Sequence, residues 1–306
     1  MAVSYGRAGD GQRLGFPGLA EFVVREGGRE VLCRPDRATP ASTLRHLLLD
    51  QVLPRVLSLR GDLVLHAGCV VTESGACAFV GPSGAGKSTL CAAFAVRGAR
   101  VLADDCVIVR RSGNRGIEVS ASYPGLRLFP QTRDLLGLCS EGTAPVSHYT
   151  DKRRFAVPFE QGPVPLQALF VLAEEGPAAH GSAVEVLPVR GRAAFLVLLR
   201  SLFQLHLDDR CRSSELFKQV AAVADELPIH RLRCPRDLTR LPAVCAAILR
   251  AAAARPSDPP HLRDRHDVVP IHQHEPVVAE EPQELVRGGV EEVRYSEPER
   301  PRCCEE

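Results

Sequence analysis

The segment "AFVGPSGAGKSTL", residues 78 to 90, runs from apolar residues through a glycine-rich turn to a lysine, two hydroxyl residues and a leucine. Gly81, Gly86, Lys87 and Ser88 complete the pattern G-x-x-x-x-G-K-[ST], in which a strand leads through a loop into a helix. The apolar residues before and after the loop favour this interpretation over a chance glycine-rich turn. The sequence therefore predicts a phosphate-binding loop.

Each part of this loop has its own physical task. Glycines let the backbone curl so that its N–H groups point at an anion, and the helix that opens at Lys87 adds its positive end. The Lys87 ammonium is expected to reach the β and γ phosphates of ATP, and the Ser88 hydroxyl is a hard ligand for Mg²⁺. The residues expected to bind the nucleotide are Gly81, Pro82, Ser83, Gly84, Ala85, Gly86, Lys87, Ser88 and Thr89.

Two adjacent aspartates, Asp104 and Asp105, follow an apolar run in "RVLADDCVIV". Since one helix separates them from Lys87, we expect the loop and the acidic pair on neighbouring strands of one β-α-β unit. Side chains next to each other on a strand point in opposite directions, so the two carboxylates differ in role only if the chain bends there. We expect Asp104 to hold the metal and Asp105 to accept a proton from a hydroxyl nucleophile. The alternatives are exchanged roles, or one aspartate that is a buried structural group or a turn residue.

The surrounding sequence predicts a mixed α/β fold. Residues 41 to 59 form a helical apolar face that Pro54 interrupts, and a helix follows the loop from Lys87 to Arg97. Strands are expected at 62–72, 76–81, 99–111, 117–122, 166–174 and 183–189. Further helices are expected at 192–203, 214–226 and 241–253. This divides the chain into an N-terminal extension (1–60), a catalytic domain (61–254) and a disordered tail (255–306) rich in proline and charge.

Composition excludes several classes of function. With 38 basic and 37 acidic residues and a net charge of +1, the chain has no general character of a nucleic-acid binder. No apolar run approaches the length that spans a membrane, and no signal peptide is recognised at the N-terminus. The 11 cysteines have no repeated spacing, which is typical of free thiols in a reduced compartment. We therefore expect a cytoplasmic protein with no nucleic-acid or membrane partner.

His66, in "LVLHAGCVV", precedes the loop, and a histidine in a strand pattern is more often a core side chain than a catalyst. The whole stretch "LHAGCVVTESGACAFVGPSGAGKSTLCAAFAVRGARVLADD", however, resembles the catalytic core of HPr kinase/phosphorylase from His66 to Asp105. The resemblance implies a P-loop core of the phosphoenolpyruvate carboxykinase-like type with a mixed β-sheet, and homo-oligomers as in family relatives. It also implies catalytic roles for His66, Lys87 and Asp105, and metal binding by Ser88 and Asp104.

The chain departs from the family pattern in two places. The family's Glu-Ile-Arg-Gly-Leu-Gly stretch is missing, and "SYPGLRLFP" (122–130) stands in its approximate place. That segment resembles the divergent HPr-kinase-like serine kinases, some of which belong to peptide-tailoring pathways. With about sixty residues before the first catalytic strand, we also expect no counterpart of the family's separate N-terminal domain. Arg127 and the basic run Lys152, Arg153 and Arg154 are candidates to stabilise a transferring phosphoryl group, or else solvated surface charges.

These residues predict an ATP- and Mg²⁺-dependent kinase whose acceptor is a serine hydroxyl of a protein or peptide. Asp105, aided by His66, is expected to take the hydroxyl proton, while Lys87 and Mg²⁺ neutralise the leaving phosphates. Two alternatives stay open at this stage. One is a small-molecule kinase on the same core, and the other is a nucleotide-binding regulatory module with little transfer activity.

Overall fold

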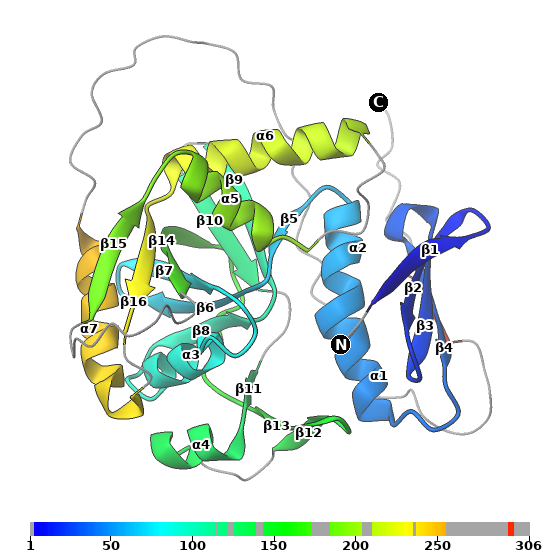
Figure 1. Cartoon of the computed structure of the whole chain (residues 1–306), viewed down its shortest axis with the longest axis horizontal. Coiled ribbons are helices and arrows are strands. Elements are labelled where there is room, and N and C mark those ends of the chain that lie inside the picture. The colour runs from blue at the N-terminus through cyan, green and yellow to red at the C-terminus, as the bar shows by residue number, and fades with distance from the viewer. Residues whose placement is uncertain are drawn as a thin grey trace, which may run out of the picture.

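The computed structural model describes residues 3–113, 116–121, 125–138, 143–172, 184–203, 210–234, 237–254 and 293–296. They form a mixed α/β protein with three β-sheets, as the sequence predicts for the fold class (Figure 1). The largest sheet and its helices lie on one side of the molecule in Figure 1. The N-terminal sheet lies on the other side, and helix 41–59 stands between them.

The largest sheet has nine strands. Seven follow the order β5-β9-β10-β14-β7-β6-β8, and the other two form a branch in which β16 pairs with β14 and β15 pairs with β16. The pairs β7–β14 and β14–β16 are parallel, while the other pairs are antiparallel, so the sheet is mixed. Its strands are β5 (Leu63–Leu65), β6 (Ala67–Thr72), β7 (Gly75–Val80), β8 (Arg100–Asp104), β9 (Val107–Ser112), β10 (Gly116–Ala121), β14 (Val164–Leu172), β15 (Glu185–Val189) and β16 (Ile229–Arg233).

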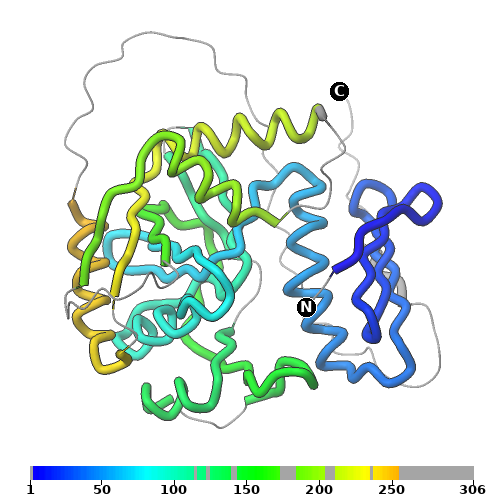
Figure 2. The backbone as a smooth tube through the Cα atoms, viewed as in Figure 1, coloured from blue at the N-terminus to red at the C-terminus, as the bar shows by residue number. Residues whose placement is uncertain are grey.

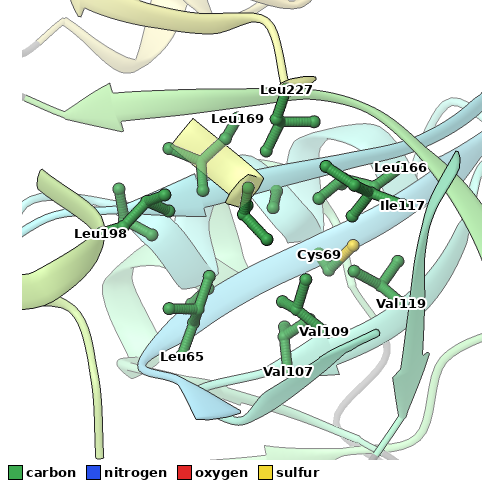
Figure 3. Close-up of a cluster of buried hydrophobic side chains, with 14 of the residues drawn as sticks. Leu65, Cys69, Val107, Val109, Ile117, Val119, Leu166, Leu169, Leu198 and Leu227 are labelled. Atoms are coloured by element: carbon green, nitrogen blue, oxygen red, sulfur yellow. The ribbon is translucent and has the colours of Figure 1, made fainter. Parts of the chain in front are cut away.

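Helices cover both faces of this sheet because its strands are apolar on both sides. On β7, Ala78 belongs to the core under α5 and α6, and the next residue, Phe79, belongs to the core under α3 and α7. Figure 3 shows part of the first core, in which Leu198 of α5 joins Val107 and Val109 of β9. The helices are α3 (Lys87–Ala95), α5 (Arg192–Arg200), α6 (Arg210–Glu226) and α7 (Leu241–Ala253).

The N-terminal residues, expected as an extension, form an antiparallel sheet of their own (Figure 2). One face of it packs Leu14, Phe16 and Phe22 against Leu47 and Val56 of the helix that follows. The sequence-based division did not foresee this sheet, whose short strands alternate apolar and polar residues only in part. Its strands are β1 (Ser4–Ala8), β2 (Gly11–Phe16), β3 (Ala20–Arg25) and β4 (Glu30–Pro35).

The segment from 41 to 59 is helical throughout, as α1 (Ala41–Leu47), a π-helical turn (Leu48–Val52) and α2 (Leu53–Leu59). The interruption expected at Pro54 takes the form of the π turn, and the chain remains helical across it. A proline has no N–H to donate, and its ring presses on the carbonyl four residues earlier. The wider π turn lies immediately before Pro54, where this strain would arise, and the chain continues as helix.

The expected tail, 255–306, falls largely outside the described residues. Within it, β17 (Val293–Ser296) pairs antiparallel with β4, with Tyr295 opposite Val31. The expectation of a largely disordered tail stays a prediction for the residues outside this strand.

A third, small sheet has the order β11-β13-β12. Its strands are β11 (Leu126–Leu128), β12 (Ala144–Ser147) and β13 (Thr150–Phe155), and helix α4 (Pro130–Leu136) follows β11.

The eight cysteines in the described ranges are free thiols, as the sequence predicts. None of the helices that the structure describes combines the length and apolar character needed to cross a membrane.

Candidate functional site

The predicted phosphate loop connects β7 to α3. Gly81 has φ +152°, and a Cβ there would lie 2.8 Å from the Leu172 carbonyl oxygen of the neighbouring strand. Gly86 has φ +98° and precedes the first turn of α3, where the left-handed backbone favours glycine. Both glycines of the motif are therefore required by the backbone path, in the absence of any ligand. The loop directs the N-terminal end of a nine-residue helix toward its centre.

Lys87 is buried at the start of α3, and its side chain folds back over the loop. Its Nζ donates hydrogen bonds to the carbonyl oxygens of Gly81, at 2.8 Å, and Pro82, at 3.1 Å. Burial lowers the pKa of Lys87, although the nearby Asp105 and Asp104 carboxylates act in the opposite direction. The ammonium is thus held at the centre of the loop, where phosphate oxygens are better partners for it than the carbonyls it now contacts.

The strands on which His66 and Asp105 were expected to lie are both broken at these residues. His66 separates β5 from β6, and Asp105 lies between β8 and β9 with φ +113°. The expectation of one continuous strand at 62–72 and another at 99–111 is therefore wrong, because each range contains two strands. A non-glycine residue at such a φ is strained by about 1–3 kcal/mol, and strain of this kind concentrates at functional sites.

The two breaks face each other, because β5 pairs with β9 while β6 pairs with β8. The Asp105 N–H donates to the Ala67 carbonyl oxygen at 3.0 Å, and His66 Nδ1 lies 3.2 Å from the Asp105 carbonyl oxygen. The chain therefore bends at the Asp104–Asp105 pair, as different roles for the two carboxylates require. The bend brings Asp105 next to His66.

One expectation about this region is wrong. The loop strand β7 and the aspartate strand β8 are not neighbours, since β6 lies between them and pairs with both. The short "TESG" turn folds β6 against β7 as a hairpin and so fills the position beside β7. Helix α3 consequently crosses over β6. The packing of α3 on β6 brings the phosphate loop close to the acidic pair at the end of β8.

This packing depends on Gly68, a residue of β6 that was not among the site residues expected from the sequence. A Cβ at Gly68 would lie 2.7 Å from the Cys91 Sγ of α3 and 3.7 Å from the Lys87 Cβ. Gly68 is also the residue opposite Asp104 in the β6–β8 pair. The small residue therefore lets the first turn of α3 approach the acidic strand closely, which a glycine in a strand interior commonly signals.

The contact of His66 Nδ1 with a carbonyl oxygen, which can only accept a hydrogen bond, places a proton on Nδ1. In the neutral imidazole, which a lowered pKa favours, Nε2 then carries the lone pair. Nε2 lies 4.0 Å from Asp105 Oδ1, and the ring meets Phe203 edge to face. Burial lowers the pKa of His66, which Asp105 counteracts without reversing. The His66 and Asp105 side chains remain 35% and 26% exposed, so an acceptor can approach both.

Asp104, in contrast, is almost fully buried. Its Oδ2 accepts the Arg127 backbone N–H at 2.8 Å. Burial and the adjacent Asp105 raise the pKa of Asp104, against the lowering influence of Arg127 and the Ser88 hydroxyl. Its other oxygen, Oδ1, is buried without a hydrogen-bond partner of ordinary geometry among the described residues.

A divalent cation fits this donor set. Mg²⁺ prefers hard oxygens and is commonly held by one or two carboxylates together with substrate phosphates. Asp104 supplies a buried carboxylate with an unpartnered oxygen, and Ser88 supplies a hydroxyl beside it. Within the part of the chain that is described, no group of three His, Cys, Asp or Glu side chains forms a protein-only metal site.

Arg127 is buried to 2% exposure, so the alternative of a solvated charge is wrong for this residue. Its Nη2 lies 2.8 Å from Asp105 Oδ2, and its Nε lies 3.6 Å from Asp104 Oδ2. Asp50, which the sequence argument missed, is its third carboxylate partner. Burial alone would lower the pKa of Arg127, but the three carboxylates raise it above its ordinary value.

The basic run on β13 divides its side chains among different tasks. Lys152 Nζ lies 5.2 Å from the centre of the Phe129 ring, and its charge contributes to the lowered pKa of Lys87. Arg153 donates to Thr143 through Nε and Nη2, each at 2.8 Å. Burial lowers the pKa of Arg154. Of the three, Lys152 is the one whose charge acts on the phosphate loop.

No family model matches this chain, and no curated protein does either. Among solved structures, it is similar to the Hpr(Ser) kinase/phosphatase from Coxiella burnetii, with 12% sequence identity and a TM-score of 0.33. The match covers 61% of this chain and 93% of that chain. A likeness at this level carries no argument about function, which has to rest on the residues of the site.

Proposed function

We propose that this protein is an ATP- and Mg²⁺-dependent kinase of the HPr-kinase-like type, which transfers the γ-phosphoryl group to a serine hydroxyl of a protein or peptide. The observation that supports this most is the pair formed by Asp105 and His66 at two facing strand breaks, next to a phosphate loop. A module that only binds a nucleotide has no use for two partly exposed proton acceptors, the Asp105 carboxylate and the His66 imidazole, beside the phosphates. A kinase needs them to receive the proton of the acceptor.

In the proposed reaction, the Asp105 carboxylate takes the proton from the acceptor hydroxyl. The freed oxygen attacks the γ-phosphorus, the bond from that phosphorus to the β–γ bridging oxygen breaks, and ADP leaves. Lys87 turns from the Gly81 and Pro82 carbonyls to the phosphates and balances their charge. His66, neutral and with Nε2 unprotonated, lies beside Asp105 and provides a second acceptor for the proton.

Ser88 and Asp104 would hold Mg²⁺ in this proposal. When bound, Mg²⁺ neutralises charge on the phosphate oxygens and helps to orient them. Asp104 is suited to a fixed ligand because it is buried and anchored by the Arg127 backbone N–H. Asp105 is suited to proton transfer because its carboxylate is partly exposed. The unequal burial of the two carboxylates supports the assignment of different roles.

The choice of a serine in a protein or peptide rests on the resemblance from His66 to Asp105. It is tested by incubating the full chain with γ-labelled ATP and Mg²⁺, and with acceptors of three kinds: HPr, serine-centred peptide libraries with matched alanine libraries, and a pool of small hydroxyl metabolites. We expect acid-stable phosphoserine in a macromolecular or peptide acceptor. Label in the small-molecule pool alone would instead identify a small-molecule kinase. Tight ATP binding without any transfer would identify a regulatory module.

A further inference from the structure

Three carboxylates from distant parts of the chain converge on the Arg127 guanidinium. Asp104 and Asp105 come from the end of β8, and Asp50 comes from the helix that follows the N-terminal sheet. Nη2 contacts Asp105, Nε lies toward Asp104 and Nη1 contacts Asp50 Oδ1. Each nitrogen of the guanidinium is thus directed at a different carboxylate.

Asp50 is itself held firmly. It is 1% exposed, lies within the π turn Leu48–Val52, and pairs with His46 Nδ1 one turn earlier on the same helix. Burial would raise the pKa of Asp50, but Arg127 and the His46 hydrogen bond outweigh it and the pKa is lowered. A buried carboxylate is costly unless it is paired, so Asp50 requires partners such as Arg127 and His46.

The same helix also fixes the small sheet that contains Arg127. Thr43 is completely buried, and its Oγ1 accepts the His148 backbone N–H at 3.0 Å and lies 2.8 Å from His148 Nδ1. His148 follows β12, and β12 and β11 both pair with β13. One face of the helix therefore anchors both the guanidinium of Arg127 and the sheet that carries its backbone.

The geometry of a guanidinium makes this arrangement consequential. Its nitrogens form a rigid planar fork, so fixing Nη1 also fixes the direction of Nη2. With Nη1 on Asp50, Nη2 holds Asp105 Oδ2, while Asp105 Oδ1 is the oxygen that lies 4.0 Å from His66 Nε2. The contact with Asp50 thus draws part of the Arg127 charge away from the Asp104–Asp105 pair, where that charge would otherwise compete with a cation.

We infer that Asp50 is a positioning residue of the active site, which acts through Arg127 on Asp105 and Asp104. Helix 41–59 is accordingly a part of the catalytic machinery and not a separate N-terminal attachment. The catalytic part of this inference rests on the proposed kinase function. The positioning of the acidic pair does not, because it also governs how Mg²⁺ and ATP bind together.

The test compares Asp50→Asn with Asp62→Asn. Asp62 also pairs with an arginine, Arg110, at 2.9 Å, but it directly precedes β5 and is not one of the three carboxylates that converge on Arg127. For Asp50→Asn at saturating Mg²⁺ we expect kcat to fall by about 10²-fold, the loss typical of a displaced reacting group, with the KM for ATP changed less than about twofold. Asp62→Asn should leave kcat at the wild-type value. Equal kcat values for the two variants, normalised to folded protein, would overturn the inference.

A double-variant comparison separates positioning from general damage. If Asp50 acts through Asp105, the Asp50→Asn change should lower kcat in the wild-type background but add little in an Asp105→Asn background. Additive effects of the two changes would contradict the inference. If Asp50→Asn does not fold, Asp50→Glu replaces it with Asp62→Glu as its control. The longer carboxylate should then lower kcat several-fold at unchanged KM, and no loss would contradict the inference.

A readout that needs no phosphoryl transfer keeps this test apart from that of the proposed function. The Mg²⁺ concentration that gives half-maximal binding of a fluorescent ATP analogue should rise several-fold in Asp50→Asn and not in Asp62→Asn. If the wild type binds ATP but transfers nothing, the kinase proposal fails while this shift still decides whether Asp50 positions the acidic pair. An unchanged Mg²⁺ requirement, with transfer intact, would show that Asp50 has a structural role alone.

Discussion

The phosphate loop and the acidic cluster differ in how the chain builds them. The loop comes from one continuous run, Gly81 to Thr89, whose glycines and helix start set its shape locally. The acidic cluster comes from three separate segments, which contribute Asp50, the Asp104–Asp105 pair and Arg127. The proposed nucleotide site is therefore a local property of the sequence, whereas the placement of the proposed proton acceptor, Asp105, is a property of the whole fold.

The largest expected effect follows from changing the proton acceptor alone. Asp105→Asn keeps size and an oxygen that can still face Arg127, but removes the basicity of the carboxylate. Phosphoryl transfer should fall by about 10² to 10⁴-fold, while ATP affinity changes little because the loop is untouched. Single-turnover transfer and equilibrium ATP binding measure the two quantities.

The neighbouring Asp104→Asn variant is the matched control and should raise the Mg²⁺ requirement. If the two variants show the opposite pattern, the roles of the two aspartates are exchanged. A normal transfer rate in Asp105→Asn would mean that Asp105 is not the base.

Changing the loop should produce the complementary pattern. Lys87→Ala removes the cation that the loop holds at its centre, so ATP binding should weaken by about tenfold or more, as for loss of a charge-assisted hydrogen bond, and transfer should be lost. The contacts of Lys87 that are seen go to loop carbonyls, so the far-UV circular dichroism should stay that of the wild type. Calorimetric titration with ATP checks the first point. Wild-type affinity would place the nucleotide elsewhere.

The acidic cluster should also make the protein sensitive to acid in a way the loop does not. The pKa of Asp50 lies below its ordinary value of 3.8 in the folded chain. Its ionised form therefore stabilises the fold at pH values above 3.8, and this contribution is lost as the pH falls through the lower, folded pKa. Asp50→Asn should lower the free energy of unfolding by about 3 kcal/mol at pH 7.

The difference between Asp50→Asn and wild type should shrink below pH 3.8, as measured by urea unfolding at several pH values. The half-buried pair of Asp62 provides the comparison, where Asp62→Asn should cost about 1 kcal/mol or less. A gap between wild type and Asp50→Asn that does not depend on pH would contradict the ionised Asp50–Arg127 pair.

The smallest expected effect is at Gly68, where the two regions meet. Gly68→Ala places a Cβ 2.7 Å from Cys91 Sγ, so it should destabilise the fold by about 1–3 kcal/mol as overpacked cores do. The displaced helix start should also weaken ATP binding modestly. Thermal unfolding with and without ATP measures both effects. The double variant with Cys91→Ala removes the sulfur and should recover most of the loss, and no recovery would place the strain elsewhere.

The sequence predicts the loop, the helix after it and the candidate residues on either side because these depend on short-range patterns. The sequence does not predict the strand breaks at His66 and Asp105, because apolar residues continue on both sides of each. The breaks arise from pairing: β5 pairs with β9, whereas β6 pairs with β8. The sequence also places β7 beside β8, because a hairpin insertion leaves no mark in the spacing between Lys87 and Asp104.

Arg127 and Asp50 show what a sequence lacks even where it holds a signal. Arg127 is the lone cation of "SYPGLRLFP" and follows Gly125, whose φ of +105° favours glycine, by two residues. Asp50 was visible as a single acidic residue in the leucine-rich run "HLLLDQVL". Each was open to a bland interpretation by itself. Their pairing depends on the packing of helix 41–59 against the small sheet, which no local pattern encodes.

The pairing of β17 with β4 has a consequence for the order in which the protein can be completed during synthesis. Residues 30 to 33 leave the ribosome long before their partners, residues 293 to 296, because most of the described chain lies between the two strands. Throughout translation the outer edge of β4 presents backbone groups that β17 will later satisfy, and such an open edge is a template for pairing with another chain. The nascent protein is thus exposed to strand exchange between copies for as long as its own closing strand has not been made.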